Sequence, residues 1–267
     1  HPSGGISGNH NFAAASFTGA GGFRMVASTG MTTIGGTYTL AGPLIADGGK
    51  VSFTIPITVS DDITVTGGVL ELNSATTVNA DVELLGGGDL IANASVPVSG
   101  GFTQSNNSSL LGGTGTVTVT GKYSWESGTQ QGSGETIANG GIDIMPGNHY
   151  LRERTLTIND ASVWTGGLIY LYLGATINNN DTLDIQTDAN MQHQQNPNSI
   201  LNNNGTITKS FSGDGDSVTS IAADLTNAGS LSVASGSLAF QRTFTQTSTG
   251  TLFVDIADGA FDSFAVS

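Results

Sequence analysis

A short phrase that recurs at a fixed interval constrains the fold of this chain more than any other feature. Its three copies begin at Ile177, Leu201 and Leu225, so successive copies start 24 residues apart. Each copy runs from an apolar residue through turn-forming residues to a hydroxyl residue and an apolar–polar alternation, which is typical of strand, tight turn and strand. A period of this length predicts a solenoid in which each repeat forms one coil.

Weaker relatives of this phrase stand at 137–144 and 156–159, and alternating segments extend the pattern over the rest of the chain. Apolar–polar alternation is clear at 51–55, 63–66 and 114–120, with glycine, asparagine or aspartate between the alternating segments. The spacing is tighter in the first half than in the last. We therefore predict an all-β fold, a single parallel β-helix (β-solenoid) over residues 1–267 with roughly 11–13 coils, irregular over 1–50 and regular over 51–267.

The composition limits the partners of such a solenoid. The 267 residues include 21 acids but only 7 Lys and Arg, a net charge of −14, which argues against nucleic acid and anionic membranes. No apolar run approaches the roughly 20 residues that span a bilayer, so no membrane insertion is predicted. The absence of cysteine excludes disulfides and thiolate metal sites. The chain starts at His1 without Met, which suggests a processed or excised segment.

Several coil phrases resemble those of large repetitive bacterial surface proteins of the autotransporter-passenger and filamentous-adhesin type. The phrases that carry the resemblance are Leu156 to Asn159, Trp164 to Gly167, Gly174 to Asn179, Leu201 to Thr206 and Gly250 to Val254. The resemblance implies a right-handed parallel β-helix at an extracellular or cell-surface location. It also implies a non-enzymatic role as a stalk, a fibre or an adhesive segment.

An enzyme is the alternative interpretation. A polysaccharide-active β-helix, either a lyase or a glycoside hydrolase, needs charged side chains from adjacent coils on one face. Arg152 and Arg154, with Asp143 near them in the sequence, are the residues that would build such a site. A plain salt bridge between coils is the preferred interpretation, so we predict no catalytic and no cofactor-binding residue.

Metal binding has little support in the sequence. Asp214 and Asp216 stand on a glycine-punctuated turn and would begin a calcium site, but the further acids of such a loop are missing. An ordinary acidic turn is preferred. The four histidines lack the spacing of a metal site or a catalytic triad, and we interpret them as solvated loop residues. They are His1, His10, His149 and His193.

Other patterns predict packing. Asparagines at the coil corners are expected to form hydrogen-bonded ladders, and Trp125 and Trp164 to occupy stacked positions two coils apart. Segment 192–197 is predicted to be an insertion that bulges from a corner. The alternating threonines of 114–120 suggest ice binding, but residues chosen for strand propensity are the preferred interpretation.

The expected partners follow from the ends of the solenoid, where the sequence shows no cap. Uncapped coils expose backbone groups that template further pairing. We therefore expect copies of the protein stacked end to end, or adjoining coils of one long chain. The strands at 253–256 or 264–266 would then meet the coils near 17–23 of a neighbour. Surface glycans are the other expected class of partner.

Overall fold

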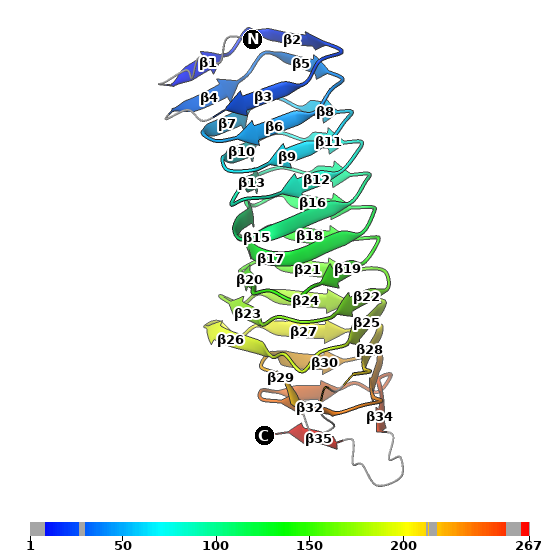
Figure 1. Cartoon of the computed structure of the whole chain (residues 1–267). Helices are drawn as coiled ribbons and strands as arrows, with labels where there is room; N and C mark the ends of the chain where they lie inside the picture. The colour runs from blue at the N-terminus through cyan, green and yellow to red at the C-terminus, as the bar shows by residue number, and fades with distance from the viewer. Residues whose placement is uncertain (1–8, 27–29, 212, 214–217, 255–262, 267) are drawn as a thin grey trace.

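The structure is a computed structural model that describes residues 9–26, 30–211, 213, 218–254 and 263–266. Its regular elements are strands, which stack in parallel as a β-solenoid of about 11 turns. Figure 1 shows the coils following one another along a single rod from the N-terminus to the C-terminus. The predicted all-β class and solenoid are therefore confirmed, and the number of turns lies within the predicted range.

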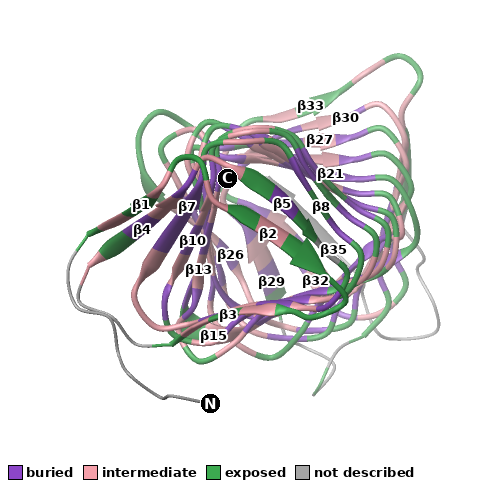
Figure 2. Ribbon diagram, turned by 90° about the horizontal axis from the view of Figure 1, so that it is seen from above, coloured by how far each residue is buried: buried purple, intermediate pink, exposed green. Residues whose placement is uncertain are grey.

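Each coil adds one strand to each of three faces, which form the three-sided outline in Figure 2. Face 1 contains β1 (His10–Phe12), β4 (Met31–Ile34), β7 (Lys50–Phe53), β10 (Val69–Leu72), β13 (Asp89–Ala92), β20 (His149–Arg152), β23 (Ile169–Tyr172), β26 (Met191–Gln195), β29 (Val218–Ile221), β32 (Ser237–Phe240) and β35 (Ser263–Val266). Face 2 contains β2 (Ser16–Gly19), β5 (Thr37–Leu40), β8 (Ile57–Val59), β11 (Thr76–Val78), β14 (Val96–Val98), β16 (Thr116–Val119), β18 (Glu135–Ala138), β21 (Thr155–Ile158), β24 (Thr176–Asn179), β27 (Ile200–Asn203), β30 (Asp224–Asn227) and β33 (Phe244–Gln246). Face 3 contains β3 (Phe23–Val26), β6 (Leu44–Asp47), β9 (Ile63–Val65), β12 (Val82–Leu84), β19 (Ile142–Ile144), β22 (Ser162–Trp164), β25 (Thr182–Ile185), β28 (Thr206–Lys209), β31 (Ser230–Val233) and β34 (Thr251–Val254).

Two long strands connect two of the faces. β15 (Phe102–Gly112) and β17 (Tyr123–Gln131) begin on face 3 and bend into face 1, so both faces belong to one 23-stranded sheet. Face 2 is a separate ten-stranded sheet from β8 to β33, and β2 and β5 form a two-stranded sheet before it.

The repeated phrase has the predicted register. Ile177 pairs with Leu201, and Leu201 pairs with Leu225, on successive strands of face 2. In the first half of the rod the interval is shorter: Asn73 and Asn93, whose side chains are hydrogen-bonded between neighbouring coils, are 20 residues apart. The interval rises to 24 residues from β24 to β27 and from β27 to β30, as predicted from the spacing, and returns to 19 residues from β30 to β33.

The interior is mainly apolar because alternation turns every second residue of a strand inward. Each buried aliphatic side chain of this kind contributes about 1.5–3 kcal/mol of transfer free energy. One inward row of face 2 reads Val59, Val78, Val98, Val119, Ala138 and Ile158, all fully buried. Trp125 and Trp164 occupy the same inward row of face 3 two coils apart, as predicted, and Ile144 stands between them in that row.

Tight stacking explains the glycines of the repeated phrase. At the corner between faces 2 and 3, after the asparagines of each coil, Gly205 stacks on Asp181 and Gly229 stacks on Gly205. A Cβ atom on Gly229 would lie 1.9 Å from the carbonyl oxygen of Gly205, and one on Gly205 would lie 2.0 Å from that of Asp181. Glycine is required here because no side chain fits between stacked corners.

Asparagine side chains form the predicted ladders along this corner. The exposed outer ladder connects residues of four successive coils at 2.9–3.0 Å: Asn204, Asn180, Asn159 and Asn139. A second ladder is fully buried, in which Asn179 donates to Asn203 at 2.8 Å and Asn203 donates to Asn227 at 2.6 Å. Each ladder binds one coil to the next through side-chain amides.

The structure corrects two expectations about the coils. His149 is fully buried, because it is the first inward residue of β20 and precedes the outward Tyr150 and the inward Leu151. Most of the predicted insertion at 192–197 is a strand: Gln192–Gln195 lies in β26 and pairs with β23, where a bulge absorbs one extra residue. The corner that follows is one residue longer than that of the preceding coil, because residues 196–199 stand opposite 173–175.

Candidate functional site

Tyrosines gather on the outer surface of face 1. Three of the five tyrosines of the chain lie there, half-buried: Tyr150 on β20, and Tyr170 and Tyr172 on β23. Tyr150 pairs with Tyr170 in register, and their rings stack with centroids 5.0 Å apart and planes 11° apart. The spacing between parallel strands thus builds an aromatic surface that neither strand makes alone.

Arg152 completes this surface. It pairs in register with Tyr172, and its guanidinium lies 4.1 Å from the centroid of the Tyr172 ring and 5.9 Å from that of Tyr150. Its Nε atom is shielded from solvent without a hydrogen-bond partner in the described chain. Ring contact therefore holds the guanidinium, an attraction of about 0.5–2 kcal/mol. We call Tyr150, Arg152, Tyr170 and Tyr172 the Tyr–Arg patch.

A polar pocket continues the surface on the next coils of face 1. It measures about 240 Å³, and its polar lining comes from Asn190, Gln192, His193, Gln194, Ser220 and Gln241. Gln192 pairs in register with Tyr170, so this pocket adjoins the Tyr–Arg patch. Gln194 Nε2 donates to Gln192 Oε1 at 3.1 Å, and the Ser220 amide donates to Asn190 Oδ1 at 2.7 Å. We call it the amide pocket.

The residues predicted for a polysaccharide-active site are not brought together. Arg152 faces outward from face 1, whereas Arg154, after the exposed Glu153, is fully buried. Asp143 lies on β19 of face 3, where its carboxylate is 3.6 Å from the ammonium group of Lys122. The three candidate residues therefore share no cleft.

Arg154 fastens three successive coils at the corner between faces 1 and 2. Its guanidinium donates to Thr136 Oγ1 at 2.8 Å and to the carbonyl oxygens of Glu135 at 2.8 Å, Gly113 at 3.2 Å and Gly115 at 3.4 Å. Burial lowers the pKa of Arg154 to about 10, so the side chain is still a cation at neutral pH. The predicted salt bridge is wrong, because the partners in these bonds are a hydroxyl group and main-chain carbonyls.

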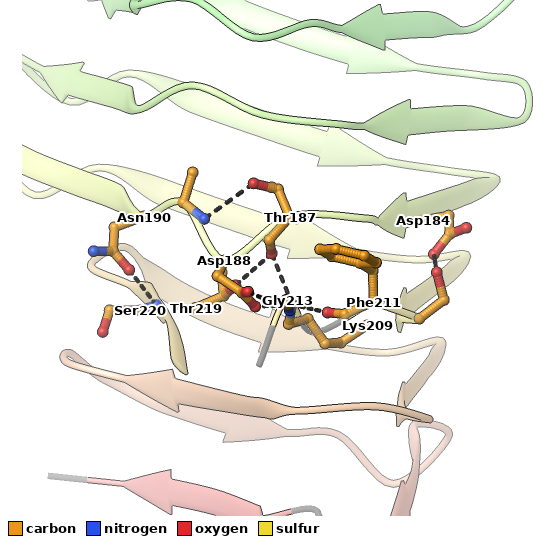
Figure 3. A network of polar contacts seen from close by, with 11 residues as sticks. Asp184, Thr187, Asp188, Asn190, Lys209, Phe211, Gly213, Thr219 and Ser220 are labelled. Atoms are coloured by element: carbon orange, nitrogen blue, oxygen red, sulfur yellow. Dashed lines mark hydrogen bonds and ion pairs between the residues drawn. The ribbon is translucent and has the colours of Figure 1, made fainter. Parts of the chain in front are cut away.

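Lys209 has a similar role near the predicted calcium turn (Figure 3). It is fully buried, and its ammonium group donates to Thr187 O at 2.7 Å, to Asp188 Oδ1 at 2.8 Å and to Phe211 O. The other Asp188 oxygen accepts from the Gly213 amide at 2.8 Å. The buried ammonium group of Lys209 thus binds oxygen atoms of Thr187, Asp188 and Phe211.

The metal candidates Asp214 and Asp216 lie outside the described residues. Within the described part of the chain, no three His, Asp or Glu side chains gather in a way that could hold a metal ion. His1 also lies outside it. The preference for an ordinary acidic turn over a calcium site therefore stays a prediction.

The buried histidine is held in its neutral form. The Nε2 atom of His149 lies 2.9 Å from the carbonyl oxygen of Trp125, and the two rings meet edge to face with centroids 4.8 Å apart. Burial lowers the pKa of His149 to about 3. His193 Nδ1 lies 3.3 Å from Ser199 Oγ at the edge of the amide pocket, and His10 lies on β1 against Phe12.

Threonines align on face 2 more often than the sequence indicated. They occupy six positions of the central outward row: Thr58, Thr77, Thr118, Thr157, Thr226 and Thr245. Pro97, Ile137, Asn178 and Asn202 interrupt that row. The interruptions agree with the preferred interpretation, in which these threonines serve strand propensity.

Sequence reasoning missed the Tyr–Arg patch, although a signal was present. The segments His149-Tyr150-Leu151-Arg152 and Ile169-Tyr170-Leu171-Tyr172 alternate identically one coil apart. Aligning them in register would have placed their aromatic and basic residues side by side on the outside.

Comparison of the chain with known protein families, with curated proteins and with solved structures finds no match. Among the described residues, no helix has the length and hydropathy needed to cross a membrane.

Proposed function

We propose that this chain is a non-enzymatic structural β-solenoid that acts outside the cell as a stalk, a fibre or a surface-contact segment. The observation that carries the proposal is the Tyr–Arg patch beside the amide pocket, on one side of a continuous parallel stack. Each coil is hydrogen-bonded to its neighbours, so the stack presents this surface in fixed geometry. The resemblance of the coil phrases to bacterial surface proteins supports the location.

The separation of Arg152, Arg154 and Asp143 supports the non-enzymatic part of the proposal. A β-helix that cleaves polysaccharide needs converging acids, or a base beside acids, around the scissile bond. Here one arginine contacts tyrosine rings, the other binds carbonyl groups, and the aspartate pairs with a lysine on a different face.

Adhesion under flow tests the proposal. Beads coated with the chain should stick to cultured cells or to polysaccharide-coated glass, and Tyr170→Ala should weaken that adhesion several-fold. Thr118→Ala on face 2 is the matched control and should leave adhesion unchanged. Adhesion to none of these surfaces would contradict the proposed contact role. Release of reducing ends from the polysaccharide would contradict the non-enzymatic assignment.

A further inference from the structure

We infer that the Tyr–Arg patch and the amide pocket together form a binding surface for an uncharged glycan chain that lies along the rod axis. The inference rests on the proposed surface-contact function and names its ligand class. From β20 to β29, the surface crosses four consecutive strands of face 1, about 14 Å at the spacing of parallel strands. It is therefore longer than a single sugar ring.

The chemistry of the side chains fits a sugar. A pyranose ring has C–H groups that pack on aromatic carbon and hydroxyl groups that both donate and accept hydrogen bonds. The patch supplies aromatic rings with phenol groups at their tips, and the pocket supplies the amides of Asn190, Gln192, Gln194 and Gln241. Side-chain amides also donate and accept, so each can bind a hydroxyl group in either orientation.

The distribution of charge favours a neutral glycan. The described lining of the amide pocket has no carboxylate and no lysine or arginine, and the one guanidinium of the patch is engaged with tyrosine rings. The chain as a whole has a net charge of −14, which repels polyanions. An acidic glycan would have only Arg152 to oppose this repulsion.

A protein partner fits the same surface less well. The centre of a protein interface is apolar and well packed, with aliphatic as well as aromatic side chains. Of the large hydrophobic side chains that are exposed in the described chain, only Leu173, at the corner after Tyr172, and Val218, at the start of β29, lie next to this surface. The amide pocket continues the surface with polar atoms instead, which suits hydroxyl groups.

Affinity electrophoresis and calorimetry with defined polysaccharides test the inference. The neutral probes are laminarin, xylan, mannan and dextran, and the acidic probes are alginate and heparin. The wild-type chain should bind at least one neutral probe and no acidic probe. Tyr170→Ala and Gln194→Ala should each weaken that binding tenfold or more, whereas Tyr170→Phe should retain most of it. Thr118→Ala and Thr226→Ala on face 2 should have no effect.

The outcomes separate the inference from the proposed function. Gln194 is exposed, so its replacement tests the surface even if Tyr170→Ala lowers the melting temperature. Failure to bind every neutral probe, preference for an acidic probe, or indifference to both replacements overturns the inference. If coated beads still adhere through Tyr170 while no glycan binds, the contact function stands and its partner is a protein. If glycan binds but beads do not adhere, the proposed function falls.

Discussion

One inward row of face 2 is built in two ways along the rod. In the first coils the row consists of valines such as Val78 and Val98, whereas in the later coils it consists of Asn179, Asn203 and Asn227. The backbone pairing is parallel in both regions, and the coils of the asparagine region are longer. Stacking in register therefore accepts either an apolar column or a hydrogen-bonded column at the same position.

The two columns differ in how their members depend on one another. Burial of valine is non-directional, so each side chain contributes largely by itself. Each buried asparagine amide donates once along the row and once to a carbonyl of face 3, as Asn203 does to Asn227 Oδ1 and to Ser230 O at 2.8 Å. Removing one member leaves the groups of its neighbours unpaired, and buried unpaired groups are costly.

The boundary between the two columns shows this dependence. Asn179 is the first asparagine of the row and pairs with Ile158 of the preceding coil. Its Oδ1 atom is buried and has no hydrogen-bond partner in the described structure. An aliphatic neighbour cannot supply the donor that the next asparagine would supply.

The largest effect is expected from Asn203→Leu, in the middle of the ladder. The replacement removes three hydrogen bonds and takes the Asn203 donor away from Asn227 Oδ1 and Ser230 O, at a cost of about 4 kcal/mol in the free energy of unfolding. Urea unfolding monitored by circular dichroism measures it. Asn204→Ala, in the exposed outer ladder, is the control and should cost less than about 1 kcal/mol.

The second-largest effect is expected from acid, which should unfold the coils around His149 before the coils that contain Val78 and Val98. The folded pKa of about 3 is below the unfolded value of 6.5, so the folded state binds fewer protons. The contribution of the neutral His149 to the free energy of unfolding is fully present above pH 6.5. It falls by about 1.4 kcal/mol for each pH unit as the pH drops from 6.5 toward 3. Relative to His149→Met, the wild type should lose about 3 kcal/mol between pH 7 and pH 4. Equal acid sensitivity of the two proteins would show that His149 is not buried.

Val98→Asn places a single amide in the valine column. No neighbouring amide can pair with it there, so the replacement should cost about 2 kcal/mol. Urea unfolding monitored by circular dichroism, as for Asn203→Leu, measures this loss of stability. A neutral effect would mean that the interior of these coils holds polar partners that the structure does not show.

Ile158→Asn should have the smallest effect. It buries another amide, but it also offers a donor to the unpaired Oδ1 atom of Asn179, so the change in stability should stay within about 1 kcal/mol. Asparagine at this boundary should therefore be tolerated better than asparagine at position 98. A cost equal to that of Val98→Asn would contradict the idea that the ladder can be extended.

The coil register could be predicted because it repeats in the sequence, whereas the side-chain partners could not. Ile177, Leu201 and Leu225 align as their spacing predicts, and glycine marks the corners where no side chain fits. The burial of Arg154 and Lys209 was not predicted from the sequence, since basic residues are rarely fully buried. Arg154 is buried because carbonyl groups at the coil corner accept its hydrogen bonds, whereas Lys209 is buried because carbonyl groups and the carboxylate of Asp188 accept from its ammonium group.

The surface of face 1 was missed for a related reason. Tyr150, Tyr170 and Arg152 become neighbours only when two coils are aligned, and their weak alternation lacks the fixed 24-residue interval of the later phrase. Buried His149 was misassigned because polar interior residues follow no periodic rule. Periodicity thus identifies strands and corners, while the chemistry of a row depends on coils that are distant in the sequence.

Spin-label distances along face 2 test the stacked register most directly, because the chain has no cysteine and accepts labels at chosen sites. Thr118 and Thr226 lie five coil steps apart in the same row, and Thr77 and Thr226 lie seven steps apart. At about 4.8 Å per step, pulsed electron paramagnetic resonance should give distances of about 24 Å for the first pair and about 34 Å for the second. Distances that do not grow in proportion to the number of coils would contradict the rod.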